Sequence, residues 1–128
     1  MKTQYIVALS VAAGVAIGAA AIQTLHAQAK PAGYVVVEID VSDPDAYAKE
    51  FLPGAGKALA DAGIKFLARG GKTISIEGEP PQKRMVIGQF ENLEKAHAAY
   101  TSPAYTEARK IGNKYAKFRI YAIEGVSP

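Results

Sequence analysis

The hydrophobic and polar residues of the segment GYVVVEIDV, residues 33–41, alternate at every second position. One face of this alternation carries Val35, Val37, Ile39 and Val41. The other face carries Tyr34, Val36, Glu38 and Asp40. A period of two predicts a β-strand, and the two apolar residues on the second face indicate that water does not wholly cover it.

The next segment, SDPDAYAKEF, has the signals of a helix start. Ser42 or Asp43 can cap the helix, and Pro44 suits its first turn. Pro53 predicts a kink or break near Leu52, because proline lacks the amide hydrogen that a helix interior needs. The apolar stripe of this helix steps by four residues through Tyr47, Phe51, Ala55 and Leu59.

Further strands are predicted where alternation returns: residues 64–69, 73–78, 84–90 and 117–125. In the segment TISIEG, Ile74 and Ile76 are expected to point inward. Asn92 can cap a helix that runs to about Tyr100, and Ser102 before Pro103 restarts it. The order of elements predicts an α+β sandwich of the ferredoxin-like βαββαβ type with an antiparallel sheet. Both helices then cover one sheet face, and the other face is exposed to water or covered by another copy.

The segment ARGGKT resembles the end of a phosphate-binding loop, G-x-x-x-x-G-K-[ST]. That motif needs a glycine five residues before Gly71, where this chain has Phe66, and it must open a helix. The following TISIE is β-branched and alternating, so both requirements fail. The two glycines, Gly70 and Gly71, are instead expected to form a bulge or bend.

The N-terminal segment predicts export. Lys2 precedes a run from Tyr5 to Ile22 without a charged residue, and Ala27-Gln28-Ala29 supplies a small-x-small cleavage site. Residues 1–29 are therefore predicted to be a signal peptide cleaved after Ala29, which places residues 30–128 in the periplasm or outside the cell. The alternative is an uncleaved membrane anchor, since the apolar run is long enough at the lower limit.

Composition narrows the functional classes. Residues 30–128 keep 14 of the 15 basic residues beside 12 acidic ones, and the signs alternate along the chain. This pattern argues against a nucleic-acid-binding stripe. The chain has no cysteine, which excludes disulfides, thiol chemistry and a lipid-modified cysteine anchor. About 100 residues bury a modest fraction of their surface, so an apolar interface with a partner subunit would add stability.

The stretches FLARGGKTISIEGE, KRMVIGQFENLEKAHAAYTSPAYTEA and the closing IEGV resemble the DUF1330 family of small bacterial proteins. The likeness runs from Tyr34 to about Val126. The resemblance implies the dimeric α/β-barrel superfamily, in which two ferredoxin-like subunits pack their sheets face to face. That superfamily includes antibiotic-biosynthesis monooxygenases and muconolactone-isomerase-like proteins. The function of DUF1330 itself is unassigned, so the resemblance implies no catalytic residue.

Two positions depart from the family pattern. Members often have a Trp-Tyr pair in the second helix, where this chain has Ala99-Tyr100. Members also often carry an arginine after the tyrosine of the S-P-x-Y motif, where this chain has Gly112, and Arg109 is the candidate to replace it.

Candidate ligand-binding residues gather in the second helical region: His97, Tyr100, Tyr105 and Arg109. His97 could act as a general base or an axial haem ligand, and the alternative is a partly buried histidine at the edge of the core. Tyr105 and Arg109, one turn apart, could bind a carboxylate or enolate oxygen. The alternative is packing, which also explains the tyrosines of this region, Tyr115 included.

A second group of residues is predicted to be structural or to lie at the interface: Arg69, Gly70, Gly71, Glu77 and Gly78. Arg69 is expected on the strand face opposite Phe66, where it could pair with Glu77 at a dimer interface. Arg84 and Glu38 fit the same description, and for all four residues the expected role is a charge exposed to water or placed at the interface.

The residues predict neither a metal site nor a cofactor. The one histidine of residues 30–128 and the scattered carboxylates make no ligand cluster, and no dinucleotide motif is present. Three functions remain open. They are a homodimer that binds a small organic molecule between helices and sheet, a cofactor-free monooxygenase or isomerase acting on a small aromatic or lactone, and a structural or stress-associated dimer without a ligand.

Overall fold

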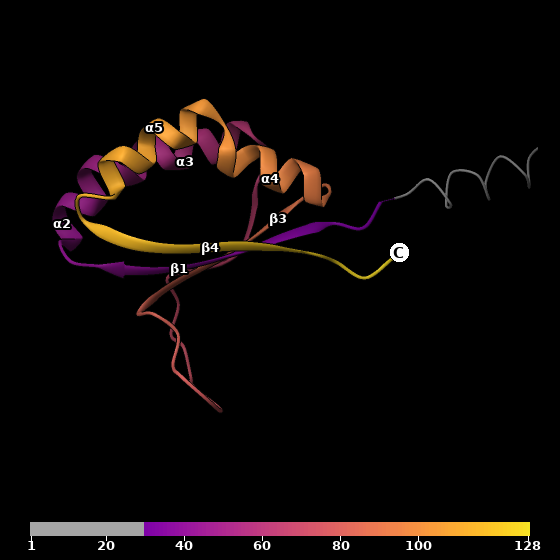
Figure 1. Cartoon of the computed structure of the whole chain (residues 1–128), viewed down its shortest axis with the longest axis horizontal. Helices are drawn as coiled ribbons and strands as arrows, with labels where there is room; N and C mark the ends of the chain where they lie inside the picture. The colour runs from indigo at the N-terminus through magenta and orange to yellow at the C-terminus, as the bar shows by residue number, and fades with distance from the viewer. Residues whose placement is uncertain (1–29) are drawn as a thin grey trace, which may run out of the picture. The chain divides into compact units, whose positions relative to one another are not determined.

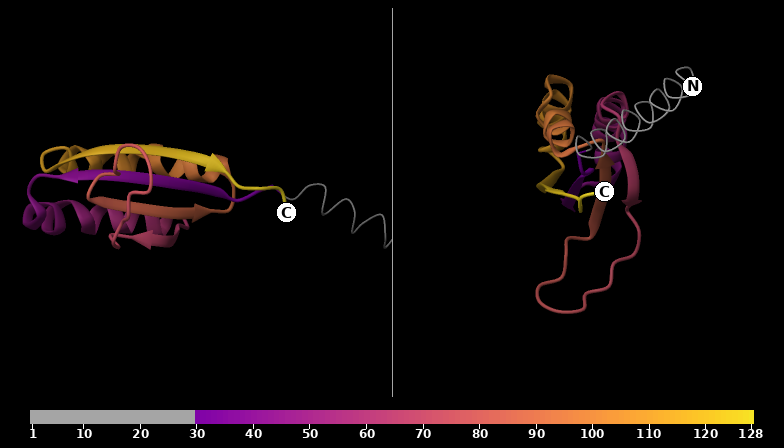
Figure 2. Two further views of the ribbon diagram at one scale, coloured as in Figure 1. Left: turned by 90° about the horizontal axis from the view of Figure 1, so that it is seen from below. Right: turned by 90° about the vertical axis from the view of Figure 1, so that its right-hand side faces the viewer.

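A four-stranded antiparallel sheet forms one layer of the protein, as a computed structural model of the chain shows for residues 30–128. The sheet, which Figure 1 shows edge-on, has the strand order β2-β3-β1-β4 (Figure 2, left). The strands are β1 (Gly33–Val41), β2 (Lys65–Arg69), β3 (Arg84–Phe90) and β4 (Ala116–Glu124). The predicted signal peptide lies outside the described residues.

Helices cover one face of this sheet (Figure 1). The helical elements are α2 (Pro44–Ala46), a π-helical turn η1 (Tyr47–Phe51), α3 (Leu52–Asp61), α4 (Leu93–Thr101) and α5 (Pro103–Gly112). The order of strands and helices confirms the predicted ferredoxin-like α+β fold. In the part of the chain that the structure describes, no helix is long and apolar enough to cross a membrane.

The predicted helix caps are confirmed. The Ala46 amide donates to Asp43 Oδ1 at 3.1 Å, and the Lys95 amide donates to Asn92 Oδ1 at 2.8 Å. The Tyr105 amide donates to Ser102 Oγ at 3.2 Å, which restarts the chain as α5 after α4 ends. Each cap satisfies an amide that has no partner within its own helix.

The helical geometry changes at Leu52, where Pro53 predicted a kink or break. Because Pro53 has no amide hydrogen and crowds the preceding turn, a regular α-helix cannot continue through it. The chain widens into the π-helical turn η1, in which the Leu52 amide donates to Tyr47 O, and α3 begins at Leu52. This turn buries the rings of Tyr47 and Phe51 against the sheet.

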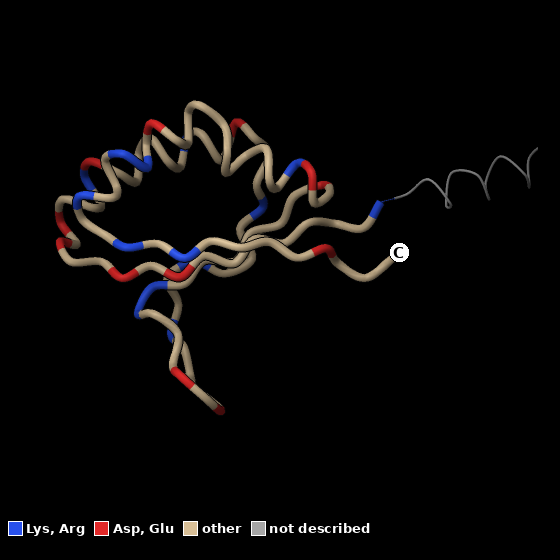
Figure 3. Tube along the Cα trace, in the orientation of Figure 1, with Lys and Arg blue, Asp and Glu red and all other residues tan. Residues whose placement is uncertain are grey.

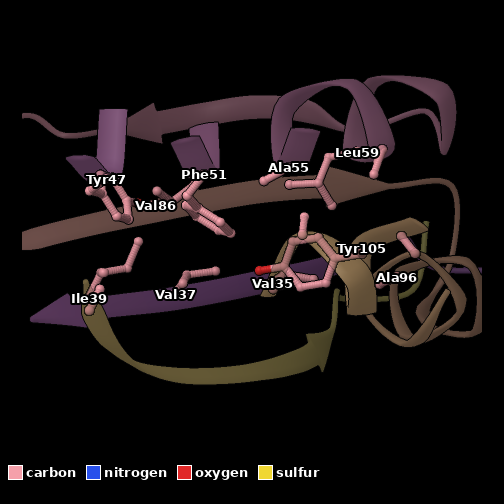
Figure 4. Close-up of a cluster of buried hydrophobic side chains, with 14 of the residues drawn as sticks. Val35, Val37, Ile39, Tyr47, Phe51, Ala55, Leu59, Val86, Ala96 and Tyr105 are labelled. Atoms are coloured by element: carbon pink, nitrogen blue, oxygen red, sulfur yellow. The ribbon is translucent and has the colours of Figure 1, made fainter. Parts of the chain in front are cut away.

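The core lies between the helices and the sheet. Val35, Val37 and Ile39 of β1 are buried, which confirms the predicted inner face of this strand. Figure 4 shows these side chains facing Tyr47, Phe51 and other apolar groups of the helical layer. The buried residues of the described chain are all hydrophobic, and charged residues of both signs are spread over the helices and the strand ends (Figure 3).

Residues 70–83 form a loop, so the predicted strand at 73–78 is wrong. Ile74 and Ile76 are 86% and 96% exposed instead of pointing inward. The loop projects away from the sheet on the side opposite the helices (Figures 1 and 2). Alternation predicts an extended chain, but a strand also needs a hydrogen-bonded neighbour, and residues 73–78 pair with none of the four strands.

The prediction that Arg69 lies opposite Phe66 is also wrong. Phe66 pairs with Gly88 and Ala68 pairs with Ile87, so β2 has a bulge at Leu67. One extra residue moves every later side chain to the other face. Arg69 therefore lies on the inner, helix-covered face with Phe66.

The other charges grouped with Arg69 in the prediction are separated by the fold. Arg84 pairs with Ile39 of β1 and shares its inner face, whereas Glu38 lies on the outer face and accepts a hydrogen bond from Arg119 Nη1 at 3.3 Å. Glu77 lies in the exposed loop. The predicted interface ion pair between Arg69 and Glu77 does not form within the described chain.

Candidate ligand pocket

A pocket of about 400 Å³ opens between the helical layer and the inner face of the sheet. The sheet contributes Val37, Ile39 and Val86 to its walls, and η1 and α3 contribute Phe51 and Leu59. Figure 4 shows these side chains facing one another across the gap between the layers. The volume lies within the range of small-molecule sites.

The apolar walls are interrupted by a few polar groups: Tyr47, Arg69, Arg84, Tyr100 and Tyr105. Mostly apolar walls with a few convergent polar groups are typical of a binding site, where the polar groups fix a ligand's orientation. Among residues 30–128, no set of histidine and carboxylate side chains could hold a metal ion.

Arg84 brings a positive charge to the pocket from the first residue of β3. Its guanidinium carbon lies 5.7 Å from the centre of the Tyr47 ring. Its Nε atom is buried, and no hydrogen-bond acceptor of the described chain reaches it. A buried donor without an acceptor is destabilising by about 1–3 kcal/mol, and Arg109 Nε is in the same state.

Gly70 makes room for this arginine. A Cβ atom at position 70 would lie 2.9 Å from Arg84 Nη1, closer than such atoms can pack. The backbone of Gly70 has φ +67°, and its amide donates to Met85 O at 2.9 Å. Left-handed backbone favours glycine, and the bond to β3 fixes it there. The predicted bend is confirmed at Gly70, which has the positive φ, whereas Gly71 has none.

Arg69 provides a second guanidinium group. Its guanidinium carbon lies 4.3 Å from the centre of the Phe66 ring, and both residues line the pocket. Within residues 30–128, no carboxylate lies within 4.0 Å of a charged nitrogen of Arg69 or Arg84. The pocket therefore has two cationic groups that no acidic side chain neutralises.

The tyrosines of the pocket keep their protons at neutral pH. Burial raises the pKa of Tyr47, although Arg84 opposes the shift by its charge and by hydrogen bonding. Burial likewise raises the pKa of Tyr105, opposed by Arg109. Burial raises the pKa of Tyr100 further, and the nearby Tyr105 adds to the shift. These hydroxyls can donate hydrogen bonds, but they are poor bases.

Tyr100 and Tyr105 form the end of the pocket nearest α4. Their rings meet edge to face, with centroids 4.8 Å apart. Figure 4 shows the Tyr105 hydroxyl directed into the layer between helices and sheet. Both residues were predicted to bind a ligand, and the structure places both in the wall of this pocket.

The other two predicted ligand residues lie elsewhere. His97 and Arg109 line a second pocket of about 300 Å³ near β4, which Tyr100 also borders. His97 is exposed. The sequence predicted either a ligand-binding histidine or one partly buried at the edge of the core. The structure thus divides the predicted set between two pockets that share Tyr100.

Arg109 is held by neighbours of its own. Its guanidinium carbon lies 3.8 Å above the Phe118 ring, and its Nη2 donates to Asn113 Oδ1 at 3.1 Å. Position 112 has no room for the arginine that the family often carries, because a Cβ there would lie 2.7 Å from Phe51 Cδ2.

Tyr115 lies outside both pockets. Its pKa is raised chiefly by a hydrogen bond with Glu50. Its carbonyl accepts a bond from the Ser42 amide at 2.8 Å, so it connects the end of β1 to the start of β4.

Three residues of the pocket were not predicted to bind a ligand: Tyr47, Arg69 and Arg84. Tyr47 was visible only as part of an apolar stripe, and the two arginines were expected at an interface. The Arg-Gly-Gly stretch was the one sequence feature that pointed to this pocket. A glycine next to a strand can mark a place where another group approaches the backbone closely. The hydrophobic pattern of residues 64–69 gave no indication of the bulge at Leu67.

Comparison with known proteins identifies the family. A profile described as a domain of unknown function, DUF1330, matches residues 32–126. The chain belongs to the DUF1330 family. No curated protein matches this DUF1330 chain.

Solved structures agree with the fold of the DUF1330 chain. A crystal structure of a protein of unknown function from Rhodopseudomonas palustris is 18% identical, with a TM-score of 0.56 over 77% of this chain and 85% of its own. A protein from Arabidopsis thaliana is 17% identical, with a TM-score of 0.50 over 77% of this chain and 98% of its own. At such identities the likeness shows the fold alone.

Proposed function

We propose that this DUF1330 protein is an exported homodimer that binds a small organic molecule in the pocket between its helices and the inner face of its sheet. The single observation that carries the proposal is the 400 Å³ pocket, in which apolar walls meet two arginines and three tyrosines. A core built for stability alone would fill this space, because interiors pack as densely as organic crystals.

The outer face of the sheet supports the homodimer. This face has no helix over it (Figure 1), and it carries apolar side chains on neighbouring strands, among them Val36, Ile87 and Tyr121. Tyr121 and Ile123 of β4 are 44% and 63% exposed. A second copy that packs sheet to sheet would remove these groups from water, as the superfamily resemblance implies.

Export follows from the predicted signal peptide, residues 1–29. Native mass spectrometry of the full-length chain, expressed with export and purified from the periplasm, tests export, assembly and ligand together. Two copies of residues 30–128 with an extra mass released on denaturation would support all three. A single detergent-dependent copy that keeps Met1 would refute both cleavage and dimerisation.

A binding assay tests the pocket directly. The neutral dye N-phenyl-1-naphthylamine fluoresces in apolar sites, and we expect it to bind the wild-type protein. Gly56 lines the pocket, and a Cβ there would meet no atom within 4 Å. Gly56→Leu should therefore narrow the pocket and weaken dye binding while the helix keeps its stability.

Ala60→Leu is the matched control, because Ala60 is exposed on the same helix α3. It should leave dye binding unchanged. Equal binding by both variants would show that the dye sits elsewhere, and no binding by the wild type would refute the pocket as a small-molecule site.

A cofactor-free monooxygenase or isomerase is the second candidate, because His97, Tyr100 and Arg109 do meet in the second pocket. His97 would move a proton there, and Arg109 would stabilise an oxyanion. An assay with small aromatic and lactone substrates tests it. Loss of turnover with retained binding in His97→Ala would favour the enzyme, and unchanged turnover would refute this role for His97.

A further inference from the structure

We propose that the ligand is an organic monoanion with an apolar body, and that Arg84, seated by Gly70, is the residue that binds its charged group. This inference rests on the proposed ligand binding. It adds the charge of the ligand, the end of the pocket that receives it, and a structural reason for the Arg-Gly-Gly stretch.

The pocket is positively charged. Arg69 and Arg84 both line it, and within the described chain neither is paired with a carboxylate. Arg84 Nη1 lies beside Gly70, the residue after Arg69, and Arg69 pairs with Val86 of β3, so two paired strands supply both arginines. Two cationic side chains that line one partly apolar pocket attract an anion.

The Arg84 guanidinium group has an unsatisfied donor. Arg84 Nε is buried without an acceptor, although a guanidinium group can donate five hydrogen bonds. A carboxylate or sulfonate can accept two parallel bonds from one guanidinium group, and such charge-assisted bonds are stronger than neutral ones. An anionic group at this end could accept hydrogen bonds from the Arg84 guanidinium group, which has no carboxylate partner within the described chain.

The rest of the pocket wall carries no charge. The remaining lining consists largely of aliphatic and aromatic side chains, and the three tyrosine hydroxyls bear no charge at neutral pH. A polyanion such as a nucleotide would bury charges against these apolar walls without partners. One anionic group at the arginine end with an apolar body behind it matches the whole lining.

Gly70 is the residue that allows this arrangement. Any side chain at position 70 would push Arg84 Nη1 from its place, since a Cβ would lie 2.9 Å from that atom. Gly70 therefore acts as a positioning residue, and Arg84 as the binding residue.

A pair of dyes tests the inference. The anionic dye 1-anilinonaphthalene-8-sulfonate and the neutral N-phenyl-1-naphthylamine share the same aromatic body and differ by one sulfonate. We expect the wild-type protein to bind the anionic dye at least about tenfold more tightly at low salt, which corresponds to about 1.4 kcal/mol. Arg84→Gln should remove this preference and leave the affinity for the neutral dye within about twofold.

The control for charge is Lys65→Gln. Lys65 is exposed on the same strand as Arg69 and pairs with Gln89 on the outer face, so this variant removes one positive charge outside the pocket. It should keep the anionic preference. Gly70→Ala provides a second variant that retains the arginine but displaces it, and it should lose most of the preference.

The outcomes separate the two proposals. If neither dye binds the wild type, the pocket is no small-molecule site and both proposals fail. If both dyes bind equally and Gly56→Leu weakens the binding of both, the proposed function stands and the anion inference is overturned. If Arg84→Gln, with a wild-type circular dichroism spectrum, keeps the preference, the role assigned to Arg84 is overturned.

Discussion

Gly70→Ala separates backbone strain from ligand positioning. At φ +67° an alanine is less favourable than glycine by about 1–2 kcal/mol, because its Cβ crowds the following carbonyl oxygen. The bond from the Gly70 amide to Met85 O keeps the backbone from relaxing. The clash with Arg84 Nη1 adds little to this cost, because that atom ends a flexible side chain that can move aside.

For a domain of about 100 residues, this loss lowers the melting temperature by roughly 5–10 °C. Differential scanning calorimetry measures it, and the anionic dye measures the displacement of Arg84 in the same sample. Gly70→Ala should therefore lose both stability and the affinity for the anionic dye.

Two neighbouring glycines serve as controls. Gly71 has no positive φ and a Cβ there meets no atom within 4 Å, so Gly71→Ala should leave stability unchanged or raise it by about 0.4–1 kcal/mol. Gly78 has φ +79° in an open part of the exposed loop. Gly78→Ala should lose stability and keep the dye affinity. If Gly70→Ala and Gly71→Ala melt at the same temperature, the left-handed backbone does not require glycine and the reasoning fails.

Other predictions follow from single features of the structure. Gly112→Ala should destabilise by about 1–3 kcal/mol in urea denaturation, because its Cβ would press on the buried ring of Phe51 at 2.7 Å. Asn92→Ala should cost about 0.5–2 kcal/mol through the lost cap of α4, and an unchanged urea midpoint would contradict this role. Ile123→Glu on the outer sheet face should shift the dimer to monomer in sedimentation, whereas Ile111→Glu on a helix should not. The three pocket tyrosines have pKa values raised above 10.0 in the folded state. Their contribution to stability is therefore complete below pH 10 and is lost as pH rises through the folded pKa values, which denaturation at increasing pH would show.

The sequence by itself determined the elements whose signals are local. Asp43, Asn92 and Ser102 each bond an amide three residues ahead, so the cap and the helix start can be read from one short stretch. The buried face of β1 follows from alternation, because successive side chains of a strand point to opposite faces. The order of these elements was enough to predict the ferredoxin-like fold.

The tertiary structure alone decided which side chains meet in the pocket. The bulge at Leu67 depends on how β2 pairs with β3, and it turns Arg69 from the outer face to the inner one. The segment 73–78 alternates like a strand but has no pairing partner in the sheet, so it remains a loop. Arg84 approaches Gly70 from a strand that is distant in sequence, and only strand pairing determines that distance. Local pattern fixes which face a residue takes within a regular element, whereas register, bulges and partners are set by contacts across the whole chain.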